Sequence, residues 1–237
     1  RAAAEALRDE FGARPLSEPA IARLADVMTR ESDPLVWTSI FELLAGDARE
    51  PSIRLAYGAL GHPSPEVRRR ACEHLAAHPD ARHGPLLLMS LADLNPAVVA
   101  AAVKALGRLN SLDDTKPLAR LLAAPDHELR VEAAKALAHL GAEAGIAALE
   151  RLTYDADPKV RRAAAVAMGE VPDASFLPEL IRLLDDRPEV RRAALVSLPR
   201  VAGREIPASA LPAPAGASPE SDPQRWKEWY RRQTTID

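Results

Sequence analysis

One stretch of this chain reads Asp157-Pro158-Lys159-Val160-Arg161-Arg162-Ala163-Ala164-Ala165-Val166-Ala167-Met168-Gly169, and five related stretches accompany it. The second residues of the six stretches fall at positions 34, 65, 96, 127, 158 and 188, so the successive steps are 31, 31, 31, 31 and 30. A period of this size is typical of solenoids, in which paired helices stack and each pair contacts only its neighbours. The sequence therefore predicts a repeat protein that works through a long surface and not through a catalytic cleft.

The first residues of each stretch predict where a helix begins. We number the second residue of each stretch position 0. Position −1 holds a good helix N-cap in five of the six stretches, namely Asp33, Ser64, Asn95, Asp126 and Asp157; the sixth has Arg187, with Asp186 beside it. Position 0 is proline in five of the six. A capping side chain accepts a spare backbone N–H, and proline at the first helical position sacrifices no needed donor.

Three further positions are apolar in every stretch, and they predict the buried side of these helices. Position +2 holds Val36, Val67, Val98, Leu129, Val160 and Val190. Position +6 holds Ile40, Ala71, Ala102, Ala133, Ala164 and Ala194, and position +10 holds Leu44, Leu75, Leu106, Leu137, Met168 and Leu198. Residues spaced by four share one face of a helix. The alanine column predicts where neighbouring helices approach most closely.

A second helix precedes each of these in the predicted pairs. We expect these first helices at 17–30, 51–60, 82–92, 116–123, 145–154 and 174–184, each with Leu or Ile at helical spacing. The predicted organisation is a partial leading repeat helix at 1–16, a solenoid at 17–202, a Pro/Ala-rich linker at 203–222 and a Trp-rich C-terminal helix at 223–237. The fold class is therefore all-α, with about six helical hairpins.

Composition and charge limit the partners and the cellular locations that the chain fits. The formal net charge is −3, so no overall attraction draws the chain to nucleic acid or to an anionic membrane. The one cysteine excludes an internal disulfide, and no apolar run reaches membrane-spanning length. The chain begins at Arg1 without a methionine or a signal-peptide pattern, which predicts a fragment or a processed product. A cytoplasmic location is favoured, and an extracytoplasmic one requires that an N-terminal signal has been removed.

The stretch from Asp157 to Gly169 resembles the HEAT-like repeat of the phycobilisome-lyase class, whose usual form reads D-P-x-V-R-x-A-A-x-A-L-G. The 31-residue spacing is also similar to that of designed alpha-repeat proteins built from this class. The resemblance covers about residues 17–202 and implies a right-handed superhelix with the second helices on its concave side. The ending 222–230 resembles a Trp-rich tail of some bacterial HEAT-repeat proteins. The resemblance is specific for the fold and not for a function.

The outward positions of the second helices are the candidate partner-binding surface. Positions +4 and +8 vary in size and charge from one stretch to the next, whereas the core positions repeat. Side chains that do not repeat are free to match a partner, so we single out Arg69, Glu73, Lys104, Lys135, Arg162 and Arg192. The alternative is that these residues form an ordinary solvated helix face.

Position +3 carries arginine in four stretches, at Arg68, Arg130, Arg161 and Arg191, with Trp37 and Val99 as the departures. One interpretation is an anion-binding stripe. The preferred one is a structural ladder, in which the arginines pair with aspartates of the same or the next repeat. Asp126 and Asp157 stand four residues before Arg130 and Arg161, a spacing that permits such pairs.

The histidines and the cysteine do not indicate a chemical site. His74 and His78 are spaced as metal ligands on a helix can be, but a metalloprotease would need a glutamate where Leu75 stands. Cys72 occupies position +7, which is apolar in the other stretches, so we expect a buried and inert thiol. We therefore predict no catalytic residue, no metal and no cofactor.

Trp226, Trp229 and Tyr230 lie near the end of the chain, and their spacing places them together on one helix. They predict either a cap that covers the open end of the solenoid or an anchor for a partner.

These observations favour a non-enzymatic scaffold that binds another protein or a peptide on the concave face. Two alternatives stay open. A bilin lyase-like enzyme is implied by the resemblance, although aromatic residues make up only 4% of the chain. A DNA-binding HEAT-like protein would need a cationic groove, and here the outward arginines alternate with Glu42, Glu73 and Glu189. Nucleic acid and membrane insertion are therefore not expected, and the oligomeric state is not predicted.

Overall fold

A computed structural model of the chain describes residues 16–171, 173–203 and 223–234. The predicted leading helix at 1–16 and the predicted linker at 203–222 lie outside these ranges, apart from Leu16 and Gly203. Within the described ranges the regular structure is helical, without strands. The chain divides into two compact units, Arg1–Leu118 and Ala119–Asp237, which we describe separately.

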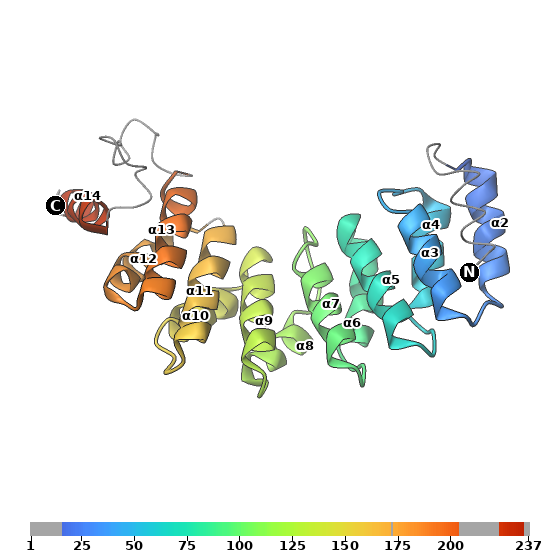
Figure 1. Cartoon of the computed structure of the whole chain (residues 1–237), viewed down its shortest axis with the longest axis horizontal. Helices are drawn as coiled ribbons and strands as arrows, with labels where there is room; N and C mark the ends of the chain where they lie inside the picture. Colours follow the sequence, from blue (N-terminus) through green and yellow to red (C-terminus); the bar gives the residue numbers. More distant parts are fainter. Residues whose placement is uncertain (1–15, 172, 204–222, 235–237) are drawn as a thin grey trace. The chain divides into compact units, whose positions relative to one another are not determined.

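The N-terminal unit contains three of the predicted hairpins. Its helices are α2 (Glu18–Met28), α3 (Pro34–Leu43), α4 (Glu50–Ala59), α5 (Pro65–Ala77), the 3-10 turn η1 (Ala81–His83), α6 (Gly84–Ser90) and α7 (Pro96–Leu106). Helix α5 contacts both α3 and α7, so the second helices of successive hairpins lie side by side (Figure 1). Helix α2 packs on α4, and α6 packs on α7. Helix α8 (Lys116–Arg120) spans the boundary between the units.

The C-terminal unit completes the set of six hairpins. It contains η2 (Leu121–Ala123), α9 (His127–His139), α10 (Glu143–Leu152), α11 (Pro158–Glu170), η3 (Ala174–Phe176), α12 (Leu177–Arg182), η4 (Leu183–Asp185), α13 (Pro188–Ala202) and α14 (Pro223–Thr234). Helix α11 packs against α9 on one side and α13 on the other, and α10 packs on α9 (Figure 1). The predicted all-α, HEAT-like solenoid is confirmed. The right-handed sense of its superhelix stays a prediction.

All six second helices begin at position 0, as the capping pattern predicts. The side chains of Asp33, Asn95, Asp126 and Asp157 each accept a hydrogen bond from the backbone N–H two residues on, at 2.8–2.9 Å. The prediction is wrong for Ser64, whose side chain makes no capping bond. Its backbone N–H instead donates to His62 Nδ1 at 3.0 Å. The α5 start therefore relies on its proline at position 0.

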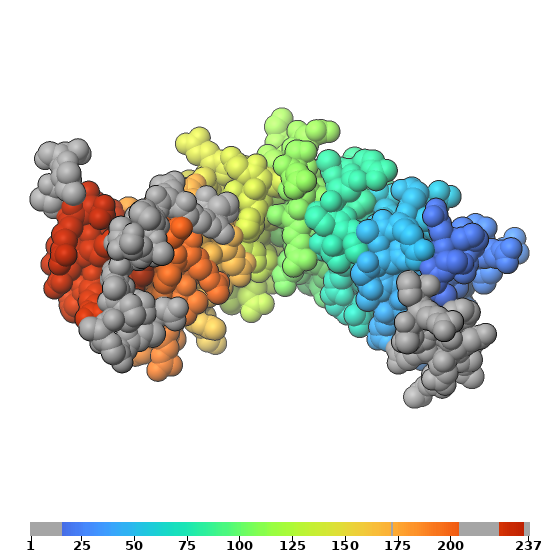
Figure 2. All heavy atoms as spheres, turned by 90° about the horizontal axis from the view of Figure 1, so that it is seen from above, coloured from blue at the N-terminus to red at the C-terminus, as the bar shows by residue number. Residues whose placement is uncertain are grey.

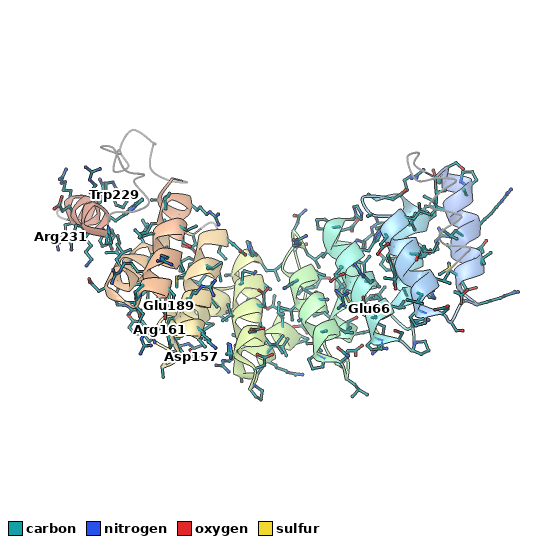
Figure 3. The ribbon with its side chains drawn as sticks, viewed as in Figure 1. Glu66, Asp157, Arg161, Glu189, Trp229 and Arg231 are labelled. Atoms are coloured by element: carbon teal, nitrogen blue, oxygen red, sulfur yellow. The ribbon has the colours of Figure 1, made fainter. Side chains whose placement is uncertain are left out.

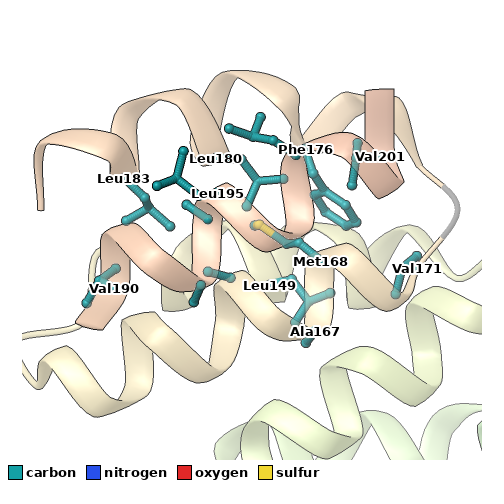
Figure 4. Packing of buried hydrophobic residues seen from close by; sticks show 14 of the residues in the cluster. Leu149, Ala167, Met168, Val171, Phe176, Leu180, Leu183, Val190, Leu195 and Val201 are labelled. Carbon is teal, nitrogen blue, oxygen red and sulfur yellow. The ribbon is translucent and has the colours of Figure 1, made fainter. Parts of the chain in front are cut away.

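The core positions are buried as predicted, with two exceptions at +2. Every residue at +6 and +10 is buried, whereas Val36 and Leu129 at +2 are only half-buried. In the C-terminal unit, Met168, Phe176 and Leu180 are completely buried in one cluster, where first and second helices meet (Figure 4). Each such side chain contributes about 1.5–3 kcal/mol by leaving water. The cluster therefore holds each hairpin against the next.

Three of the first helices are less regular than the sequence predicts. The expected helices at 82–92, 116–123 and 174–184 are each divided between a short α-helix and one or two 3-10 turns. Pro85 and Pro178 follow directly on the first residues of α6 and α12. Because proline has no N–H to donate, it prevents the preceding turn from continuing as α-helix. Asp80 and Asp173 cap the 3-10 turns by accepting from backbone N–H groups at 2.9 Å.

Two glycines of the C-terminal unit lie where a neighbouring helix packs directly against the backbone. A methyl group added to Gly145 would lie 2.4 Å from the backbone nitrogen of Ala138, and one added to Gly169 would lie 2.4 Å from Ser197 Oγ. These distances leave no room for a side chain. The α10–α9 and α11–α13 contacts therefore require glycine at these positions.

Candidate interaction surface

The arginines at position +3 form a structural ladder between repeats. Arg68 makes two hydrogen bonds to Asp93, at 2.6 and 2.9 Å. Arg161 makes two to Asp186, both at 2.7 Å. Arg130 lies 3.8 Å from Asp155. The acceptor is in each case 25 residues further along the chain, just before the next second helix.

These ion pairs differ from the ones that helical spacing predicts. Asp126 and Asp157 cap their helices instead of pairing with Arg130 and Arg161. The Nη1 of Arg68, Arg130 and Arg161 each also donates to two backbone carbonyls just before its own helix, as Arg161 does to those of Asp155 and Ala156, at 2.8 and 3.0 Å. The guanidinium of Arg161 lowers the pKa of Asp186 by hydrogen bonding, and Arg68 likewise lowers the pKa of Asp93. These arginines are thus occupied and do not form an anion-binding stripe.

The ladder ends at Arg191, on the last second helix. Its Nη2 donates to the backbone carbonyl of Asp186 at 3.1 Å, while its Nε is buried without a hydrogen-bond partner. The two departures from the column, Trp37 and Val99, are both buried. Trp37 Nε1 donates to the carbonyl of Glu31 at 3.0 Å.

On α5, the predicted partner-binding residues Arg69 and Glu73 bind each other. Arg69 also pairs with Glu66 at 2.6 Å, so it is held between two carboxylates one turn away on either side. Hydrogen bonds from Arg69 lower the pKa of Glu66. Arg70 lies 3.3 Å from Glu66 and 3.8 Å from Glu73. The charges of this face therefore largely neutralise one another.

Lys135 on α9 is also paired. Its Nζ lies 3.1 Å from Glu132 on the same helix and 3.0 Å from Glu170 on α11. Burial alone would lower the pKa of Lys135, but these two carboxylates outweigh burial and raise it. Lys135 therefore links two second helices and is not available to a partner without breaking both contacts.

Lys104, Arg162 and Arg192 are exposed, and within the described ranges none of them forms an ion pair. Arg162 and Arg192 stand at position +4 of α11 and α13, one turn before Val166 and Val196 at position +8. These valines are 39% and 50% exposed. Figure 3 labels Arg161 and Glu189, which mark the beginnings of the same two helices. Of the six predicted partner-binding residues, these three keep an uncompensated charge.

The histidines of the N-terminal unit are part of its packing. His74 is buried, and its Nε2 lies 3.0 Å from Ser52 Oγ. Burial lowers the pKa of His74 to about 4. His83 donates from Nε2 to the carbonyl of His78 at 2.9 Å, so its Nδ1 accepts from the Tyr57 hydroxyl, at 2.7 Å. In the part of the chain described, no three His, Cys, Asp or Glu side chains gather as a metal site requires.

Cys72 is completely buried, and burial raises the pKa of its thiol to about 11. A thiol with this pKa is protonated at neutral pH and is a poor nucleophile.

Helix α14 packs against α12, and Figure 2 shows it in red beside the orange helices that precede it. Trp226 and Trp229 are 1% and 7% exposed, and their rings meet edge to face at 5.4 Å between centroids. Tyr230 is partly buried against the same cluster. Lys227 pairs with Asp185 of η4. The two tryptophan side chains are therefore not exposed for a partner, which favours the end-cap interpretation over the anchor.

Two features were not predicted. A cavity of about 400 Å³ lies between α2, α4 and residues 61–63, with Trp37, His62 and Arg54 among its lining residues. Arg182 stacks on the ring of Tyr154, 3.8 Å from its centroid, and Tyr154 donates to Glu179 at 2.9 Å. Arg182 and Glu179 lie on α12 and Tyr154 lies in the turn after α10, so no spacing within a single repeat indicates their contact. None of the helices described combines the length and apolar character needed to cross a membrane.

Part of this chain is similar in sequence to one curated protein. The chain is 32% identical over 128 residues to the "uncharacterized phycocyanin operon protein Z" of Pseudanabaena tenuis, a match that covers 51% of this chain and 63% of that protein. The chain thus spans less than two thirds of the curated relative it matches.

A solved structure matches the fold. The complex of CpcE and CpcF of phycocyanin lyase from a Nostoc species is similar with a TM-score of 0.55 at 17% identity, over 97% of this chain and 87% of that one. An engineered protein matches with a TM-score of 0.48 at 21% identity, over 76% of this chain and 97% of that one. The HEAT repeats family matches residues 54–130 and 115–199, which together cover more than half of the sequence. The chain therefore belongs to the HEAT repeats family.

Proposed function

We propose that this chain is a non-enzymatic scaffold that binds a protein or peptide partner on the outward face of its second helices. One observation carries the proposal: the core positions repeat, whereas the outward positions vary and include charged side chains without ion pairs among the described residues. A solenoid presents these outward positions on successive parallel helices. Such a surface suits an extended or helical partner.

The internal bonding of the candidate chemical groups supports a binding role. The Cys72 thiol has a raised pKa, His74 and His83 are buried and lie within hydrogen-bond distance of neighbouring hydroxyl groups, and the ladder arginines hold successive repeats together. The groups that face outward are charged or aliphatic side chains. These can form contacts with a partner but are not arranged as a nucleophile and base.

Site-specific photocrosslinking tests the proposal. A crosslinking residue is placed at Lys104 or Val166, on outward positions of one helix in each unit. The matched controls are Met89 on α6 and Ala147 on α10, which are exposed on first helices of the same two units. In a lysate of the organism that carries the gene, we expect protein adducts from Lys104 or Val166 and none from the controls. Equal adducts from all four positions, or none from any, would contradict the proposal.

A second candidate is a role in bilin attachment, favoured by the similarity to a phycocyanin operon protein. Incubating the chain with phycocyanobilin and a phycobiliprotein subunit distinguishes the two. A scaffold leaves the bilin spectrum and the subunit mass unchanged, whereas a lyase adds the mass of the chromophore to the subunit.

A further inference from the structure

We propose that the outward face of α11 and α13 binds an acidic, amphipathic segment of a partner protein. This inference rests on the proposed scaffold function and names the chemistry of the partner. We define the α11–α13 face as Arg162 and Val166 of α11 together with Arg192, Val196 and Arg200 of α13.

The geometry of the face follows from the repeat. Helices α11 and α13 pack directly against each other, and Arg162 and Arg192 occupy equivalent positions on them. Val166 and Val196 stand one turn further along, again at equivalent positions. Packed helices lie about 8–10 Å apart, and one turn advances by about 5.4 Å. The face is thus a pair of guanidinium groups beside a pair of valines, with Arg200 one turn beyond Val196.

The charge of this face is not compensated from within. Arg162, Arg192 and Arg200 are exposed and form no ion pair in the ranges that the structure describes. Two carboxylates are close in sequence: Glu170 is bound by Lys135 at 3.0 Å, and Glu189 lies at the start of α13 without an ion pair to Arg192. Three cationic groups therefore face one unbound carboxylate. An acidic partner would complement them, and the pairs would gain strength as the partner excludes water.

The two valines decide between classes of partner. Val166 is 39% exposed and Val196 is 50% exposed, so each leaves apolar surface in water. A nucleic acid held by its phosphates would leave this surface uncovered, and the net charge of −3 opposes it over the whole chain. A peptide segment that carries aliphatic side chains next to its carboxylates satisfies both features. Its apolar side chains would cover the valines, and its carboxylates would meet the arginines.

Selection from a display library of short random peptides tests the inference on the full chain. We expect the enriched peptides to combine Asp or Glu with Leu, Ile, Val or Phe. The affinity of a synthesised peptide should fall by about tenfold or more in the Arg162→Glu/Arg192→Glu variant and in the Val166→Asp variant. The matched control is Arg151→Glu, which reverses an exposed charge without an ion pair among the described residues, on the first helix α10 of the same unit, and should leave the affinity unchanged.

Each other result overturns the inference. Enriched peptides without acidic residues, equal weakening by Arg151→Glu, or no enrichment at all would exclude an acidic segment on this face. Duplex DNA that competes with the peptide would reassign the arginines to nucleic acid, and a dimer in sedimentation that the double variant abolishes would reassign the face to a second copy of the chain. The scaffold function itself fails only if the photocrosslinking also yields no adduct from Lys104 and Val166, or equal adducts from these positions and the two controls. The single variant Arg192→Glu, whose side chain is exposed, repeats the test should the double variant not fold.

Discussion

Helices α5 and α11 both present an arginine at position +4, yet only one of these arginines is available to a partner. On α5, Arg69 is bound by Glu66 and Glu73, at positions +1 and +8. On α11, the same two positions hold Lys159 and Val166, and Arg162 has no ion pair in the described part of the chain. The residue type at one position is therefore a poor guide to a binding surface. The residues three before and four after it decide whether its charge is neutralised.

The largest expected effect is a difference in the free energy of unfolding between variants at two adjacent arginines of α11. Arg161 is a ladder residue bound to Asp186, whereas Arg162 faces outward. Replacing Arg161 with Ala leaves the Asp186 carboxylate without its main partner and removes four hydrogen bonds, so we expect a loss of about 3 kcal/mol in the free energy of unfolding. Arg162→Ala should change it by less than about 0.5 kcal/mol. Denaturant titrations of both variants check this. Similar losses for the two would mean that the ladder contributes little.

A second difference between the helices predicts a pH dependence. Position +9 is the buried His74 on α5 and Ala167 on α11. The pKa of His74 is about 4 in the folded chain against 6.5 for a free side chain, because burial disfavours its charged form and His78 repels it. The unfolded chain therefore binds the proton first as the pH falls, and stability is lost from about pH 6.5 down to 4.

Between pH 7 and 4.5, the shift corresponds to a loss of about 2 kcal/mol. His74→Gln, which keeps a polar group near Ser52, should abolish this part of the pH dependence of stability. The ladder aspartates act in a lower range, because their pKa values lie below the ordinary value of 3.8. A variant that loses as much stability as the wild type between pH 7 and 4.5 would refute the assignment to His74.

The smallest expected effect on stability comes from copying the α5 arrangement onto α11. In the Lys159→Glu/Val166→Glu variant, Arg162 should be held by two carboxylates, as Arg69 is. Such exposed helical pairs contribute about 0.3–0.5 kcal/mol each. The free energy of unfolding should therefore rise slightly, while binding of an acidic peptide is lost. The control Lys159→Gln/Val166→Gln removes the valine without adding carboxylates, and peptide binding that survives in the double-glutamate variant would argue against the comparison.

The helix starts could be predicted from the sequence because capping is local. A side chain at position −1 and a proline at position 0 act within a few residues, and all six second helices begin where they indicate. Local reasoning is wrong for Ser64, whose side chain makes no capping bond although its helix still begins at position 0. Local reasoning also misses the division of the predicted helix at 82–92 into a 3-10 turn and an α-helix. The effect of Pro85 depends on where the turn that precedes it begins.

The candidate site was predictable only in part. The neutralisation of Arg69 can be read from Glu66 and Glu73, since all three lie on one helix. The pairing of Arg161 with Asp186 cannot be read in this way, because it depends on which loop lies beside the start of α11. The repeated offset of 25 residues is present in the sequence, but the fold is needed to show that it corresponds to a contact.

The offset of the ladder also defines what the repeating module of this chain is. Arg130 and its acceptor Asp155 both lie within residues 127–157, and Arg68 and Asp93 both lie within 65–95. A genetic duplication or deletion cut just before position 0 would thus transfer donor and acceptor together, whereas a cut between hairpins would separate them. A second helix with the first helix that follows it is therefore the self-contained building block, and the array can lengthen or shorten by whole blocks without leaving a guanidinium unmatched.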